Sequence, residues 1–158
     1  MMISEANPRP TDPVRRIMMW PVAATPIQAT MREVAESLAA DEIGILPITA
    51  NGSIVGMVSE RDVARHVASG ANPDHVCAAD IMTADVLDVT PDTDITAVAR
   101  LMLDAGVRHL MVRDGEAVAG IVSVRDALTV LTRAVTDVVP TTKTTPDTAI
   151  ATLHRRVR

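Results

Sequence analysis

The sequence contains an internal repeat. Residues 17–62 align without a gap on residues 81–126, so each position of the first copy has an equivalent 64 residues later. Ile17-Met18 falls on Ile81-Met82, and Gly56 falls on Gly120. A unit of this length is too small to bury its apolar face alone, so we expect the two copies to pack against each other. The cleft between them is the first place to look for function.

Each copy shows the same order of predicted elements. Apolar residues at helical spacing predict an amphipathic helix from Met31 to Ala39 and another from Ile95 to Leu103. A Thr-Pro pair stands before each helix. We expect its proline to separate the helix from a short strand that begins at Val22 in the first copy and at Val86 in the second.

Two apolar runs follow each helix and predict a β-hairpin. Asn51-Gly52 and Asp114-Gly115 lie between the runs, and both pairs favour a type I′ turn, because its two central residues need positive φ. A second helix is expected to begin at Ser59 and at Ser123. The predicted fold class is therefore α/β (α+β), with two β-α-β-β-α repeats packed face to face and right-handed strand-helix-strand crossovers.

The composition favours a compact cytoplasmic protein. Apolar residues make up 47% of the 158 residues, which is enough for a core, and the single cysteine suits a reducing compartment. No apolar segment is long enough to indicate a signal peptide or a transmembrane helix. The net charge of −5 and the lack of Phe and Tyr argue against nucleic acid, whose binding uses cations and aromatic stacking.

The pattern G-h-h-S-x-R-D, where h is apolar, ends both hairpins, at Gly56–Asp62 and at Gly120–Asp126. The Ser and the backbone N–H groups after it suit a phosphate, the Asp suits a ribose diol, and the Gly lets a ligand approach the strand. The structural alternative is a capping box, in which Ser and Asp only cap the helix. One copy alone favours that alternative, whereas two copies at a fixed spacing favour a binding role.

At these residues the chain resembles the tandem cystathionine-β-synthase (CBS) domain pair, also called a Bateman module. The resemblance covers residues 15–134 and includes the Ile-Met pairs, the Thr-Pro pairs, Gly44–Ile48 and both G-h-h-S-x-R-D motifs. It implies two related clefts and frequent pairing of two modules, which we expect to give a homodimer. It also implies an adenosine-containing ligand, AMP, ADP or ATP, with S-adenosylmethionine as a further candidate and no cofactor required.

The predicted organisation has five parts. They are a flexible N-terminal arm (1–14), the first repeat (15–69), a linker (70–78), the second repeat (79–135), and a polar connector with a short C-terminal helix (136–158).

Two binding sites follow from the resemblance, each with an acidic residue for the ribose. The first is expected to comprise Asp126, Ser123, Arg125, Arg108, His109, Thr25, Ile43 and Gly44. The second is expected to comprise Asp62, Ser59, Arg61, Thr90 and Val107. Because Arg108 and His109 are basic, we expect the first site to bind a phosphorylated ligand more tightly, and the imidazole to be more protonated beside the phosphate.

Three functions are open at this point. No nucleophile–base pair or Walker loop is present, so we predict that the chain is not an enzyme. The preferred hypothesis is a nucleotide-sensing regulatory module that acts on a partner protein in trans. The alternatives are a homodimeric interaction protein without a nucleotide, and a metal- or redox-responsive module that uses His66, His75 and Cys77. We predict no metal site, because the spacing of those three residues matches no zinc signature.

Overall fold

The computed structural model describes residues 6–20, 23–40 and 44–138. The first repeat consists of β1 (Thr25–Pro26), α1 (Met31–Ala40), β2 (Ile45–Ala50), β3 (Ser53–Ser59) and α2 (Glu60–Ala68). The second consists of β4 (Asp88–Val89), α4 (Ile95–Ala105), β5 (His109–Asp114), β6 (Ala117–Ser123) and α5 (Val124–Val138). A 3₁₀ helix, η1 (Val14–Arg16), precedes the first repeat, and α3 (Ala78–Ile81) precedes the second. The predicted β-α-β-β-α order is confirmed in both repeats.

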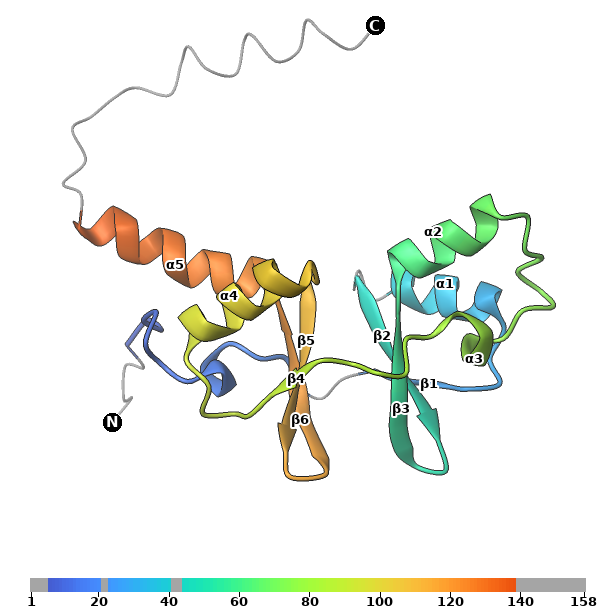
Figure 1. Cartoon of the computed structure of the whole chain (residues 1–158), viewed down its shortest axis with the longest axis horizontal. Helices are drawn as coiled ribbons and strands as arrows, with labels where there is room; N and C mark the ends of the chain where they lie inside the picture. Colours follow the sequence, from blue (N-terminus) through green and yellow to red (C-terminus); the bar gives the residue numbers. More distant parts are fainter. Residues whose placement is uncertain (1–5, 21–22, 41–43, 139–158) are drawn as a thin grey trace, which may run out of the picture.

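The strands form two sheets that face each other. In the first sheet β1 pairs parallel with β2, and β2 pairs antiparallel with β3; the second sheet repeats this order with β4, β5 and β6. The two hairpins lie at the centre of the molecule, and the helices lie on its outer sides (Figure 1). Met57, Met111 and Ile121 are buried together in one cluster with strand residues of both repeats. The predicted face-to-face packing is therefore confirmed.

In the first repeat the short first strand lies later than predicted, whereas in the second it ends before the Thr-Pro pair, as predicted. β1 is Thr25–Pro26 rather than a strand before the proline, and β4 is Asp88–Val89; Val22 lies outside the described residues. Pro26 is tolerated in β1 because this strand is at the edge of its sheet, where a missing N–H costs no ladder hydrogen bond. The proline thus belongs to the strand and does not break the chain before it.

The two hairpin turns are of different types. Asn51 and Gly52 have φ of 52° and 78°, which confirms the predicted type I′ turn. In the second hairpin Asp114 pairs with Ala117 inside the ladder, so the loop is Gly115-Glu116. Gly115 alone has positive φ there, at 60°, as a type II′ turn requires of its first central residue. The prediction of a second type I′ turn at Asp114-Gly115 is wrong by one position.

Each repeat is completed by the segment that precedes the other repeat. Val14 is fully buried in the core of the second repeat, and Ile17 and Met18 pack against that core. At the equivalent positions, Ala78 and Ile81 are buried in the core of the first repeat. The sequence repeats are therefore not separate folding units, because their starting segments are exchanged.

The first N–H groups of α4 are capped by the N-terminal segment, which we predicted to be a flexible arm. Ile95 N donates to the carbonyl of Asp12, and Thr96 N donates to that of Pro10, both at 3.0 Å. The predicted linker does the same for α1, where Met31 N donates to Val76 O at 2.7 Å. Residues 10–12 and 76 therefore belong to the fold, since a helix start needs acceptors for its free N–H groups.

The C-terminal prediction is only partly covered by the structure. Helix α5 continues to Val138, so the start of the predicted polar connector is helical. The predicted short helix near the end of the chain lies outside the described residues.

Candidate ligand-binding clefts

The acidic residue of each motif caps the helix that follows. In the first repeat Asp62 Oδ2 accepts from Ser59 N at 2.9 Å and from Ser59 Oγ at 2.6 Å, while Asp62 N donates to Ser59 Oγ at 3.3 Å. In the second repeat Asp126 Oδ2 accepts from Ser123 N at 3.1 Å and from Ser123 Oγ at 2.5 Å. The capping box, which was the structural alternative, is therefore present in both copies.

The other carboxylate oxygen, Oδ1, has different surroundings in Asp62 and in Asp126. Asp62 Oδ1 accepts from Arg65 Nη1 at 3.3 Å. The residue equivalent to Arg65 is Thr129, whose hydroxyl donates to the carbonyl of Arg125. Among the described residues no hydrogen bond to Asp126 Oδ1 is present. Both carboxylates keep acceptor capacity beyond the cap, because an ionised carboxylate has about four lone-pair sites.

The glycine of each motif makes room for backbone, not for a ligand. A Cβ at Gly56 would lie 2.8 Å from the carbonyl oxygen of Thr83, and a Cβ at Gly120 would lie 2.8 Å from that of Met19. Met57 and Thr83 exchange backbone hydrogen bonds there, at 3.0 and 2.8 Å. The predicted role in ligand approach is wrong, because the start of the opposite repeat occupies that space.

A cavity of about 350 Å³ opens beside Asp62. Its volume falls in the range of small-molecule sites, roughly 300–1,000 Å³. Its walls come from both repeats and comprise Ile45, Met57, Ser59, Arg61, Asp62, Arg65, Thr83, Asp85, Val86, Leu87, Gly106, Val107, Arg108 and His109. The cavity therefore contains the motif of the first repeat together with a wall supplied by the second.

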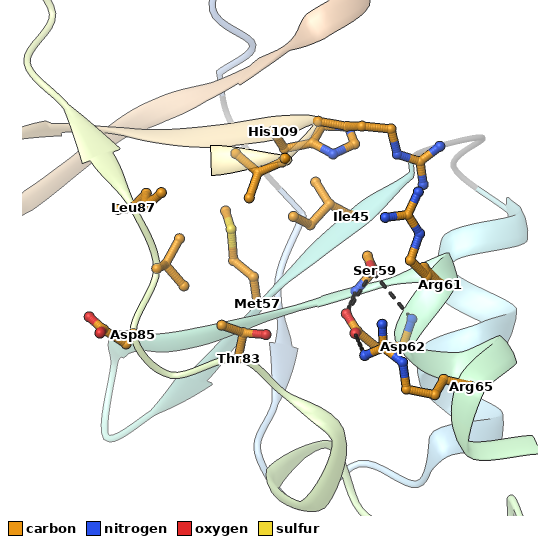
Figure 2. Close-up of a pocket in the computed structure, with 14 residues that line it drawn as sticks. Ile45, Met57, Ser59, Arg61, Asp62, Arg65, Thr83, Asp85, Leu87 and His109 are labelled. Atoms are coloured by element: carbon orange, nitrogen blue, oxygen red, sulfur yellow. Dashed lines mark hydrogen bonds and ion pairs between the residues drawn. The ribbon is translucent and has the colours of Figure 1, made fainter. Parts of the chain in front are cut away.

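The cavity has two polar ends and an apolar middle. Figure 2 shows Arg61 and Arg65 beside the Ser59–Asp62 cap at one end, and Thr83 and Asp85 at the other. The side chains of Met57 and Ile45 lie between these ends, below His109. A ligand with an apolar ring and a charged or hydroxylated portion fits this distribution of groups.

The structure places Arg108 in the wall of the Asp62 cavity, while its carbonyl accepts from Val124 N of the Asp126 motif at 2.8 Å. Helix α4 ends at Gly106, which has a φ of 66° and whose N–H donates to the carbonyls of Leu103 and Met102. This left-handed residue turns the chain so that Val107, Arg108 and His109 enter the wall of the Asp62 cavity. The predicted placement of Val107 agrees with this arrangement, whereas the predicted preference for the Asp126 site stays a prediction.

The remaining predicted site residues are spread over the fold. Thr90 is exposed after β4, does not line the Asp62 cavity and has its hydroxyl 3.1 Å from that of Thr93. Thr25 is buried in β1, and its carbonyl accepts from Thr49 Oγ1 at 3.4 Å. Ser123 and Arg125 stand at the start of α5 with Asp126. Ile43 lies outside the described residues.

His109 lies in the wall of the Asp62 cavity and close to Gly44 of the first repeat. It lines the Asp62 cavity, and its Cε1 would be 3.2 Å from a Cβ placed on Gly44. Burial lowers the pKa of the His109 imidazole, the neighbouring Arg108 lowers it further, and Asp126 and Glu60 act in the opposite direction. These surroundings favour the neutral form, and the predicted gain of a proton applies to the ring beside a bound phosphate, which stays a prediction.

Sequence reasoning missed part of the cavity wall. The segment from Thr83 to Leu87 lines the cavity, although only Thr90 was assigned from this region. Gly56 could have indicated this segment, because a glycine inside a strand often marks the close approach of another backbone. Arg65 was missed as well, although it stands three residues after Asp62 and so lies on the same side of α2.

The described residues contain neither a group of metal ligands nor a membrane-spanning helix. Within residues 6–20, 23–40 and 44–138, no three His, Cys, Asp or Glu side chains are grouped so that they could hold a metal ion. In the same ranges, no helix combines the length and the apolar character needed to cross a bilayer.

Comparison with known proteins identifies the family. The family model described as CBS domain matches the chain twice, over residues 14–69 and 78–133. The chain belongs to the CBS domain family. The two matches begin at Val14 and Ala78, the equivalent buried residues whose segments are exchanged between the repeats.

Individual relatives agree with this assignment. An uncharacterized protein of Methanopyrus kandleri, MK0525, is 36% identical over 104 residues, which cover 64% of this chain and 53% of that protein. The chain thus spans about half the length of this relative. The CBS domain pair of protein MJ0100, in complex with 5′-methylthioadenosine and S-adenosyl-L-methionine, is 25% identical, with a TM-score of 0.72 over 79% of this chain and 99% of that one.

A further structural neighbour is an oligomer. The hexameric CBS-CP12 protein from bloom-forming cyanobacteria is 25% identical, with a TM-score of 0.68 over 75% of this chain and 67% of that one.

Proposed function

We propose that this CBS pair is a regulatory module that binds an adenosine-containing ligand in the Asp62 cavity and signals to a partner protein in trans. One observation carries the proposal: a cavity of about 350 Å³ combines the Ser59–Asp62 cap of one repeat with a wall of the other. A ligand bound there contacts both repeats at once. Binding therefore biases how the two halves sit against each other, which is a change that a partner protein can recognise.

Asp62 is the acceptor that we assign to the ribose hydroxyls. Its carboxylate already accepts two bonds from Ser59 and one from Arg65, which leaves about one of four lone-pair sites free. The Arg65 side chain is 66% exposed, so its ion pair with Asp62 is worth at most about 1 kcal/mol. A ribose diol can replace Arg65 at little cost and then donate two hydrogen bonds to Asp62.

The apolar middle of the cavity suits the adenine ring. Ile45, Met57, Val86 and Val107 line it, and no Phe, Tyr or Trp is among its lining residues. The ring would be held between aliphatic side chains and the backbone of the 83–87 segment. The MJ0100 pair, whose ligands are both adenosine derivatives, supports this choice of ligand class.

We also propose that two copies of the chain associate. Helices α4 and α5 expose large apolar side chains: Leu103 is 76% exposed, Leu128 51% and Val135 65%. Apolar side chains gathered on outer helices favour a self-complementary contact. Light scattering at micromolar concentration should give twice the chain mass of 16.8 kDa. A monomer throughout that range would rule the dimer out.

A thermal-shift measurement tests the ligand class. Adenosine, AMP, ADP, ATP and S-adenosylmethionine are each added to the intact chain, with guanosine and GTP as controls. A ligand that binds only the folded state raises the unfolding temperature by mass action. We expect at least one adenosine compound to raise it, and we expect a weaker response to the guanosine compounds.

The location of the ligand is tested with Asp62→Ala. We expect this substitution to reduce the shift, while Asp104→Ala, which removes an exposed carboxylate from the outer helix α4, leaves it unchanged. If no adenosine compound shifts the parent protein, the proposed function is wrong. The homodimeric interaction protein without a nucleotide would then be the better hypothesis.

A further inference from the structure

The wall of the Asp62 cavity contains an ionisable ring, that of His109. His109 is the first residue of β5, and it lines the cavity together with Ile45, the first residue of β2 (Figure 2). The two residues are equivalent in the repeat, and they are the single equivalent pair among the described lining residues. The same position of the fold thus contributes an aliphatic side chain from one repeat and an imidazole from the other.

The imidazole also lies against the first repeat. A Cβ added to Gly44 would lie 3.2 Å from Cε1 and 3.5 Å from Nε2 of His109. The same Cβ would lie 3.8 Å from Glu60 Oε2, and the Gly44 carbonyl accepts from Glu60 N at 3.3 Å. Glu60 is the first residue of α2. The ring is therefore packed beside the start of α2 as well as in the cavity wall.

Four charged side chains act on this ring. Asp126 and Glu60 favour the imidazolium, whereas Arg108 and Arg125 disfavour it. Burial has the largest influence and also disfavours the charged form, so the pKa of His109 lies below its ordinary value. The other charged residues of the cavity wall are Arg61, Asp62, Arg65 and Asp85. These surroundings favour the neutral ring.

A neutral ligand in the cavity strengthens this preference. Adenosine is uncharged near neutral pH, so it brings no counter-ion to an imidazolium. By covering the ring it removes water that otherwise solvates the charge, and lost solvation disfavours the charged form. Ligand and proton therefore compete for the protein, and by linkage each lowers the affinity for the other by the same factor.

We propose that His109 makes the Asp62 cavity sensitive to pH as well as to its ligand: adenosine binds beside the neutral imidazole, and a proton on the ring weakens binding. This inference rests on the proposed function, which places an adenosine-containing ligand in the cavity. The proton exchanges with solvent, since His109 is half-buried and not enclosed. The regulatory signal then has two inputs, and acidification releases ligand at a constant ligand concentration.

Titration calorimetry with adenosine on the intact chain, at about pH 7.5 and about pH 5.5, tests the proposal. Adenosine is the probe because a phosphate near the ring would favour the imidazolium and mask the effect. We expect the affinity to be about threefold lower at the lower pH, within the limit of about tenfold per pH unit that one proton sets. Because binding releases protons, the heat measured at about pH 6 should differ between MES and bis-Tris buffers, whose ionisation enthalpies differ.

His109→Gln gives the decisive comparison, because glutamine is neutral at both pH values. Its affinity for adenosine should agree within about twofold between the two pH values, and its heat should not depend on the buffer. Two matched variants serve as controls and should keep the pH dependence of the parent. His75→Gln removes an exposed histidine of the linker. His66→Gln removes a histidine of α2 whose Nδ1 lies 2.8 Å from the carbonyl oxygen of Asp62 and which is not among the described lining residues.

Nuclear magnetic resonance measures the same linkage from the side of the proton. The Cε1 proton of His109, assigned by its absence in His109→Gln, reports the titration of the ring. Adding adenosine should move the midpoint of that titration to lower pH. Unfolding midpoints of the parent and of each variant at both pH values show that a lost affinity is not lost folding.

The outcomes separate this inference from the proposed function. If adenosine binds equally well at both pH values, or more tightly at the lower one, the proton proposal is overturned and the adenosine site stands. If His109→Gln keeps the pH dependence, or only His66→Gln removes it, the proton acts at another group and the proposal is also overturned. If no adenosine compound binds at either pH, the proposed function itself fails.

Discussion

The Asp62 and Asp126 ends of the molecule carry the same seven-residue motif but differ in the groups around it. Both carboxylates accept from the backbone N–H and the hydroxyl of the Ser three residues earlier. Arg65 and Arg108 line the Asp62 cavity, whereas the residues equivalent to them in the repeat are Thr129 and Gly44. The repeated part of the motif thus builds the helix start, and the flanking residues distinguish the two ends as binding sites.

The largest expected effect is the difference between Asp62→Ala and Asp126→Ala in their affinity for a nucleotide. Asp62→Ala removes the ribose acceptor beside the cavity, and we expect the affinity for ADP to fall tenfold to a hundredfold, or about 1.5–3 kcal/mol. Asp126→Ala should lower it by less than about threefold, the range of a distant or solvent-screened effect. Titration calorimetry on both variants measures this.

The two Asp variants also control for each other. Each substitution removes a helix cap, which costs about 1 kcal/mol of stability at either end. Similar unfolding free energies combined with different affinities would support the comparison. Equal losses of ADP affinity would show that the two clefts are equivalent ligand sites, in contradiction to the charge difference.

The two glycines of the motif offer a second comparison. A Cβ at Gly56 or at Gly120 would lie 2.8 Å from a carbonyl oxygen of the opposite segment. We expect Gly56→Ala and Gly120→Ala each to lower the unfolding free energy by about 2 kcal/mol, through overpacking. Gly56→Ala should in addition weaken ADP, because it displaces the Thr83–Leu87 wall of the cavity. Chemical denaturation and calorimetry test both statements, and an unchanged ADP affinity in Gly56→Ala would argue against that wall.

The N-terminal segment gives a prediction about stability alone. Val14 is fully buried in the second repeat, where the equivalent residue of the first repeat's core is Ala78. Val14→Ala should lower the unfolding free energy by roughly 1.5 kcal/mol, because it removes two buried methyl groups. Val67→Ala, at a position 54% exposed, should change it by less than about 0.5 kcal/mol. Equal effects in denaturant titrations would show that the segment is not part of the core.

The sequence predicted the elements well because their signals are local. The apolar spacing of α1 and α4, the Asn51-Gly52 turn and the Ser–Asp caps each depend on residues within a few positions of one another. The Gly115 turn was misplaced by one residue because the ladder extends to Asp114-Ala117. That register is decided by strand pairing rather than by the turn residues.

The site was predicted less well because it depends on contacts between distant segments. The acidic, serine and arginine positions of the motif were found, but Arg108 was assigned to the Asp126 site alone and its place in the wall of the Asp62 cavity was missed. Its place in that wall depends on the left-handed turn at Gly106 and on the exchange of the segments at 14–18 and 78–82. Neither can be derived from spacing within one copy.

The smallest expected effect concerns His109, which stands where the other repeat has Ile45. Burial lowers the pKa of His109 in the folded chain below its ordinary value, so the unfolded chain binds more protons around pH 6.5. Stability should therefore be fully present at higher pH and should fall as the pH drops below about 6.5. The charged groups that influence this ring are Arg108, Arg125, Asp126 and Glu60.

Denaturant titrations at about pH 7.5 and about pH 5.5 measure this effect of His109 around its ordinary pKa. The parent should lose unfolding free energy between the two values, and His109→Gln should lose less, because glutamine has no proton to gain. His75→Gln removes an exposed histidine and should behave like the parent. An unchanged slope in His109→Gln would mean that the ring is as easily protonated in the folded chain as in the unfolded one. The burial of His109 beside Gly44 would then not exclude water from the ring.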